Sequence, residues 1–209
     1  MEETTAIKLI ADFKETSLQL KLNEITSQLI GKSQVVDYNQ NKLFEAALIV
    51  KKISAQIDEI VHAAGILNAL PAILQENEKI ESISLAAGIG KERFDLSTNF
   101  RIAEFKFSEW KNGNDSRKRQ VFADCVNLLL FETEKKKELY VASCPQVKNF
   151  FQSNAGWKNM LSKSGGLAIR LQEYLTANKL EIQSVKDIFS LANIEVFDVD
   201  EIMQNHQSN

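Results

Sequence analysis

The chain has 209 residues, of which 44% are hydrophobic and 25% charged, and its formal net charge at pH 7 is −3. This composition predicts a folded chain with a sizeable core, and the acidic balance excludes a general basic field for nucleic acid, so DNA contact would need local basic patches or metal ions. With two histidines and two widely spaced cysteines, a zinc site of His and Cys is not expected; Cys125 and Cys144 are expected in the core.

The start of the chain lacks a basic segment followed by an apolar one, and the longest apolar run, 63–74, is too short to span a bilayer. We therefore expect a cytoplasmic protein that does not contact membranes. Apolar residues recur every three or four positions from residue 2 to about 31, which predicts an amphipathic helix. A second long helix is expected from Asn41 toward Pro71. Residues 1–40 are predicted to be an N-terminal helical extension and residues 41–209 the main domain.

From about residue 80 the apolar period falls to two, which predicts strands within 79–90, 93–98 and 100–110. A helix is expected within 116–137, a buried strand at 138–144, a short helix at 145–153 and another helix at 166–178. Two last strands are expected near 180–185 and 194–199. Helix, three strands, helix and strand in this order predict an α/β or α+β fold rather than a helix bundle.

The predicted hairpin at 93–107 carries charges in its middle, at Asp95, Glu104 and Lys106. With alternating side chains and Asp95 expected opposite Ile102, these charges share one face with Ile102. The apolar residues are expected on the opposite face: Phe94, Leu96, Ala103, Phe105 and Phe107. Two carboxylates suit Mg²⁺, and a lysine beside them would orient or deprotonate water or stabilise charge on phosphate oxygens. An ordinary solvated strand face is the alternative.

An Asp on one strand followed by Glu-x-Lys on the next, here Asp95 and Glu104-Phe105-Lys106, resembles the PD-(D/E)XK, restriction-endonuclease-like nucleases. The resemblance covers about residues 41–145 and implies an α/β fold whose α-β-β-β-α-β core has a mixed central sheet flanked by helices. It also implies hydrolysis of phosphodiester bonds of DNA with Mg²⁺, for which Mn²⁺ can substitute. It implies that Asp95, Glu104 and Lys106 are catalytic, and that Asp95, Glu104 and a helix glutamate bind the metal. Glu59 is the first candidate for that glutamate, ahead of Asp58 and Glu45.

The chain also departs from the family pattern. Phe94 replaces the proline of the motif, and the spacing from Asp95 to Glu104 is short. Gln120 is followed four residues later by Asp124, so the Gln-x-x-x-Tyr element of exonuclease-like members is missing, which favours an endonuclease.

Other residues have two interpretations each. His62 is either a structural histidine or a neighbour of the site, and Trp110 and Trp157 are expected to pack rather than stack on bases. A basic segment after the third strand either binds nucleic acid or is simply solvated: Lys111, Arg117, Lys118 and Arg119. The rival function is a catalytically inactive binding or scaffolding protein that acts through its N-terminal helices. A homodimer is compatible with both functions, and RNA remains open as a substrate.

Overall fold

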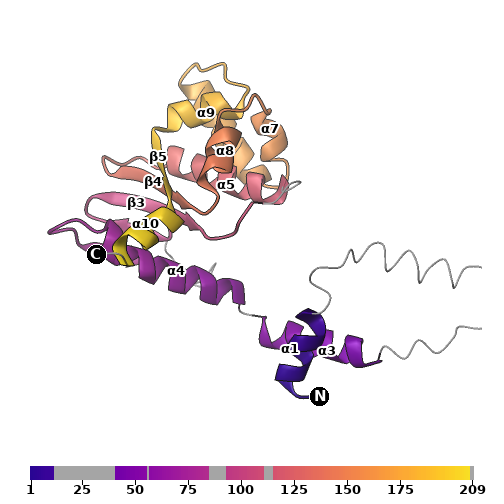
Figure 1. Cartoon of the computed structure of the whole chain (residues 1–209). Helices are drawn as coiled ribbons and strands as arrows, with labels where there is room; N and C mark the ends of the chain where they lie inside the picture. The colour runs from indigo at the N-terminus through magenta and orange to yellow at the C-terminus, as the bar shows by residue number, and fades with distance from the viewer. Residues whose placement is uncertain (12–40, 56, 85–92, 111–114, 208–209) are drawn as a thin grey trace, which may run out of the picture. The chain divides into compact units, whose positions relative to one another are not determined.

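A computed structural model describes residues 1–11, 41–55, 57–84, 93–110 and 115–207 (Figure 1). The chain divides into two compact units, Met1–Asp58 and Glu59–Asn209. The sequence places the domain boundary at 40/41 instead, so the two divisions differ in where they assign residues 41–58. Within the described ranges, no helix has the length and apolar character needed to cross a membrane.

The first unit contains helices α1 (Glu3–Ala11) and α3 (Asn41–Ile53), which pack against each other and bury Ala6 and Ala46. The N-terminal amine of Met1 lies 2.9 Å from Oε1 of Glu45. The helix expected to extend to about residue 31 is confirmed as far as Ala11, and its remainder lies outside the described residues.

The prediction of one continuous helix from Asn41 to Pro71 is wrong. The helix is interrupted after Ile53, and α4 (Ile57–Ile73) follows with Pro71 inside it. At the interruption, the Ser54 hydroxyl donates a hydrogen bond to the Val50 carbonyl at 2.6 Å. Such back-bonding by serine competes with regular helix hydrogen bonds and is unfavourable within a helix.

The second unit is built on a five-stranded mixed sheet in the order β1-β2-β3-β4-β5, which confirms the α/β class. Strand β2 (Leu96–Thr98) pairs in antiparallel with both β1 (Ile80–Ile83) and β3 (Arg101–Lys106). Strands β4 (Lys136–Val141) and β5 (Ile194–Asp198) continue the sheet in parallel from β3. The element order α4-β1-β2-β3-α5-β4 is the order expected from the sequence.

The strand expected at 180–185 is wrong, since Ser184 makes only an isolated bridge with Gly156. Ser184 instead caps α9 (Val185–Ala192), where its hydroxyl accepts a hydrogen bond from the Asp187 N–H at 3.2 Å. A serine at this position satisfies a backbone donor that the helix itself leaves free. The cap therefore begins a helix where the apolar pattern suggested a strand.

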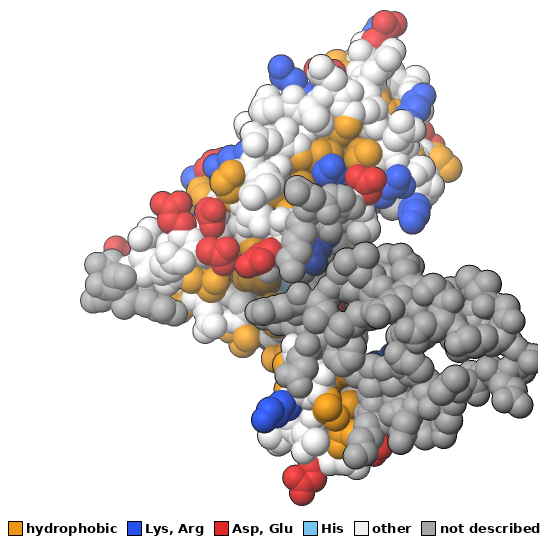
Figure 2. All heavy atoms as spheres, turned by 45° about the vertical axis from the view of Figure 1, so that its right-hand side comes forward, with side chains coloured by type: hydrophobic (Ala, Val, Ile, Leu, Met, Phe, Trp, Pro, Cys, Tyr) orange, Lys and Arg blue, Asp and Glu red, His pale blue; other side chains and the backbone are white. Residues whose placement is uncertain are grey.

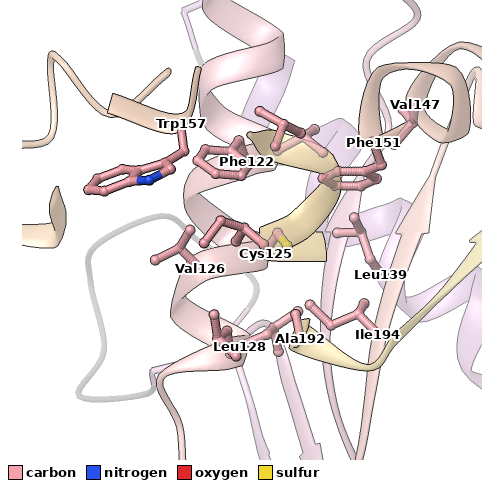
Figure 3. Packing of buried hydrophobic residues seen from close by; sticks show 14 of the residues in the cluster. Phe122, Cys125, Val126, Leu128, Leu139, Val147, Phe151, Trp157, Ala192 and Ile194 are labelled. Atoms are coloured by element: carbon pink, nitrogen blue, oxygen red, sulfur yellow. The ribbon is translucent and has the colours of Figure 1, made fainter. Parts of the chain in front are cut away.

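Helices cover both faces of the sheet (Figure 1). On one face lie α5 (Asp115–Leu129), α6 (Cys144–Phe151), α7 (Trp157–Met160), α8 (Gly165–Ala177) and α9. Figure 3 shows Phe122 and Cys125 of α5 packed in this cluster. Both cysteines and Trp157 are buried and Trp110 packs at the edge of the cluster, as expected. The other face is covered by α4 and α10 (Val199–Gln207), which pack on Phe105 and Tyr140.

The hairpin register differs from the expected one. Ser97, not Asp95, pairs with Ile102, because the two-residue turn between β2 and β3 lies at Asn99 and Phe100. Continuing this register places Asp95 opposite Glu104. Phe94 packs in the hydrophobic cluster formed with α5 to α9, whereas Leu96 packs in the cluster formed with α4 and α10. The expectation that Phe94 and Leu96 share a face is therefore also wrong.

Candidate active site

Asp95, just before β2, is held by two different elements of the fold. Its Oδ2 accepts a hydrogen bond from the backbone N–H of Phe105 on β3 at 2.8 Å. Its Oδ1 lies 3.2 Å from Nε2 of His62 on α4. The side chain is only 16% exposed, so these two contacts fix the carboxylate in a largely solvent-excluded position.

His62 is placed by the close packing of α4 on the end of β3. Its ring meets the Phe107 ring edge-on, with centroids 6.0 Å apart. Phe107 in turn lies against Gly65, where an added Cβ would stand 2.4 Å from Phe107 Cζ. Glycine leaves room for the phenyl ring here, whereas a larger residue would require the ring to move. The structure places His62 next to Asp95, partly buried and in hydrogen-bond distance of its carboxylate.

Glu104 and Lys106 alternate with Ala103 and Phe105 along β3, so they point toward α5. The Lys106 ammonium lies 3.7 Å from Oε2 of Glu104 and 3.1 Å from Oδ2 of Asp124 on α5. The contact with Asp124 was not predicted, because the sequence showed this residue only as a departure from an exonuclease motif. The available signal was a carboxylate inside the apolar run "VFADCV" of a predicted helix.

The electrostatics of the cluster favour added positive charge. Burial, followed by the negative charges of Asp124 and Asp95, raises the pKa of Glu104 to about 9. Burial also raises the pKa of Asp124, against the attraction of Lys106. Burial opposes ionisation of Asp95, but the hydrogen bond from His62, the charge of Lys106 and the N–H of Phe105 together lower its pKa. The three carboxyl groups raise the pKa of Lys106 although burial opposes this.

The chemistry of these oxygens fits a hard divalent cation. Asp95, Glu104 and Asp124 supply carboxylates, which Mg²⁺ prefers, and the raised pKa of Glu104 marks a position where a cation would replace a proton. Within the ranges that the structure describes, no three or more His, Cys, Asp or Glu side chains are already arranged around a common metal position.

The three candidates for the helix glutamate do not join this cluster through any described contact. Glu59 is exposed on α4, one turn before His62, and has no hydrogen bond or ion pair among the described residues. Asp58 is also exposed and belongs to the first compact unit. Glu45 pairs with the N-terminal amine. The structure thus brings together Asp95, Glu104 and Lys106, and adds His62 and Asp124.

The candidate nucleic-acid-binding residues differ in their contacts and exposure. Lys111 lies outside the described residues, whereas the other three lie in the first turns of α5. Arg119 donates a hydrogen bond to the Ser162 hydroxyl at 2.6 Å, and Lys118 lies 3.7 Å from Oδ1 of Asp115. Arg117 is half-buried, without a described ion pair. On the face shown in Figure 2, basic side chains are interspersed with acidic ones.

Comparisons with known proteins give no match: no protein-family model, no curated protein and no solved structure is similar to this chain at a significant level.

Proposed function

We propose that the second unit is a PD-(D/E)XK-type nuclease that hydrolyses phosphodiester bonds of DNA internally, with Mg²⁺ or Mn²⁺. The observation that carries this proposal is the convergence of Asp95, Glu104 and Lys106 from adjacent segments of one sheet. Burial, followed by the negative charges of Asp124 and Asp95, raises the pKa of Glu104, which an ordinary solvated strand face would not produce. The α4-β1-β2-β3-α5-β4 order around them is that of the proposed core.

In this proposal, Asp95 and Glu104 hold the cation. A divalent ion held there would supply Lewis acidity and make water more acidic. Lys106 stabilises negative charge that develops on the phosphate oxygens. Because its neighbours raise its pKa, Lys106 is an ammonium at neutral pH and serves as a charge or a proton donor rather than as a base. His62 and the Phe105 N–H keep the Asp95 carboxylate in place.

DNA would be held beside this site by the start of α5. A helix N-terminus with Arg117 and Lys118 offers backbone N–H groups and positive charge to phosphates. These contacts would position the backbone without reading its sequence. Their number is small, in agreement with the net negative charge of the chain, so the cation is expected to supply part of the attraction.

The test is incubation of the purified full chain with supercoiled plasmid, linear DNA and single-stranded DNA or RNA, in Mg²⁺, Mn²⁺ or EDTA. Wild type should cut the closed plasmid only with a divalent ion, and Asp95→Asn and Lys106→Ala should not. Glu81→Gln is the matched control. Glu81 lies on β1 and pairs with Lys135 at the surface, so this variant removes a carboxylate outside the site. Cleavage that survives in both site variants would point to a contaminating nuclease and would contradict the proposal.

One observation favours the rival, non-catalytic binding function. Ile7, Leu48 and Ile53 of the first unit are 50%, 50% and 42% exposed, and exposed apolar side chains often contact partners. That function predicts no divalent-ion binding by calorimetry and no cleavage of any substrate. Size-exclusion chromatography of the same sample, with light scattering, would show whether two copies of the chain associate.

A further inference from the structure

Lys106 lies between two carboxylates that come from different elements. Glu104 is its neighbour on the same face of β3, and Asp124 reaches it from α5. The ammonium is closer to Asp124, at 3.1 Å, than to Glu104, at 3.7 Å. Since attraction between charges grows as their distance shrinks, Asp124 is the stronger of these two constraints on the position of the ammonium.

The segment of α5 that carries Asp124 is packed in the hydrophobic core. The residues around it on α5, Phe122, Cys125 and Val126, are completely buried in the main core cluster. Oδ2 of Asp124 is inaccessible to solvent, and the Lys106 ammonium 3.1 Å away is the charged group described beside it. A lysine side chain has a flexible four-carbon stem, so its charged end needs a partner on another element if it is to stay in one position.

We propose that Asp124 is a positioning residue that fixes the Lys106 ammonium beside Glu104. This inference rests on the proposed nuclease function for its catalytic consequence, but the fixing of Lys106 is testable without it. The Asp124 side chain is 18% exposed and its Oδ2 is buried, so a charge there without a partner would be unfavourable, and pairing with Lys106 offsets that cost. The competing assignment, Asp124 as a direct ligand of the cation, predicts a different result.

The test compares wild type with Asp124→Asn, which keeps the shape and removes the charge, and with Asp124→Ser as a second variant. Relaxation of the side-chain Cε signals in isotope-labelled lysine, with Lys106 assigned through Lys106→Arg, reports how tightly each lysine is held. Lys106 should be more restricted than Lys118, whose pair with Asp115 is exposed, and should become as mobile as Lys118 in Asp124→Asn. Circular dichroism verifies that the variants are folded, and Glu81→Gln should leave Lys106 unchanged.

Cleavage kinetics complete the test. Asp124→Asn should lower kcat about 10- to 100-fold, a usual effect for groups that orient catalytic ones, while KM for DNA and Kd for Mn²⁺ stay within about twofold of wild type. Loss of Mn²⁺ affinity as large as in Asp95→Asn would overturn the proposal in favour of a metal ligand. Lys106 as mobile as Lys118 in wild type would also overturn it. If wild type cuts nothing, the nuclease function fails, and the relaxation comparison alone decides the role of Asp124.

Discussion

The Nε2 atom of His62 lies 3.2 Å from Oδ1 of Asp95, and this contact joins helix α4 to the start of β2. Because the pKa of Asp95 is lowered, its carboxylate is ionised at neutral pH and can only accept a hydrogen bond, so His62 must carry a proton on Nε2. The other oxygen is occupied by the Phe105 N–H. His62 therefore helps to fix the orientation of the Asp95 carboxylate, and with it the direction of the remaining lone pairs.

Replacing His62 by Ala should weaken the binding of Mn²⁺ about tenfold, because groups that orient a metal ligand typically contribute this much or more to affinity. Isothermal titration calorimetry on the full chain measures the change. His62→Gln keeps a donor of similar reach and should restore part of the affinity. Equal affinity in wild type and His62→Ala would show that the Phe105 N–H alone orients Asp95.

Gly65→Ala should destabilise the second unit by about 1–3 kcal/mol, the usual cost of overfilling a packed site, because the new Cβ would stand 2.4 Å from Phe107 Cζ. Urea unfolding measures the change. In a Phe107→Ala background the clash disappears, and the same substitution should stabilise the chain by up to about 1 kcal/mol through helix propensity. A double-mutant cycle in which the two effects simply add would contradict the packing described for Gly65 and Phe107.

Arg101 is the centre of a buried ion-pair network on the other side of β3. Its Nε and Nη2 each lie 2.7 Å from an oxygen of Glu78, and its Nη1 lies 2.8 Å from Glu138 and 3.0 Å from the Tyr140 hydroxyl. Arg101→Met should cost about 3–5 kcal/mol of unfolding free energy, since it leaves buried carboxylates without their partner. Urea unfolding measures it. Glu81→Gln should cost far less, and an equal loss in both would mean that the buried network contributes no more than an exposed pair.

The sequence predicted the parts of the site that lie close together along the chain. Alternation in "FRIAEFKF" identified β3, and the charged positions within it identified Glu104 and Lys106 as neighbours. The register was missed because it depends on which two residues form the turn, and polar residues that favour turns extend over a longer stretch of the sequence. Asp95 consequently lies opposite Glu104 instead of Ile102.

The contacts of His62 and Asp124 were not predictable in the same way. Each depends on how a helix packs on the sheet, and apolar periodicity shows which side of a helix is buried but not which strand residue it meets. Gly65 allows α4 to approach Phe107 closely, and this approach positions His62. Likewise, the apolar pattern around Ser184 predicts a strand, but Ser184 accepts a hydrogen bond from the Asp187 N–H and caps the start of α9.

The pKa of Glu104, raised from 4.5 to about 9, makes a prediction about pH and stability in the absence of divalent ions. Below pH 4.5 the carboxyl is protonated in both the folded and the unfolded chain. Between pH 4.5 and 9 only the folded chain keeps this proton, so the unfolded chain gains a solvated carboxylate and becomes relatively more favourable. The contribution of Glu104 to stability is therefore complete below pH 4.5 and falls as pH rises toward 9.

Glu104→Gln removes this dependence, because glutamine stays neutral. At about pH 8 without divalent ions, the variant should melt higher than wild type by at least about 2 °C, the shift that roughly 1 kcal/mol gives for a chain of this size. At pH 4 the two should melt together. Mg²⁺ should raise the Tm of wild type at pH 8, with release of a proton, but not that of the variant, because the cation takes the place of the Glu104 proton. A lower Tm for Glu104→Gln at pH 8 without ions would show that Glu104 is ionised and well paired in the folded chain.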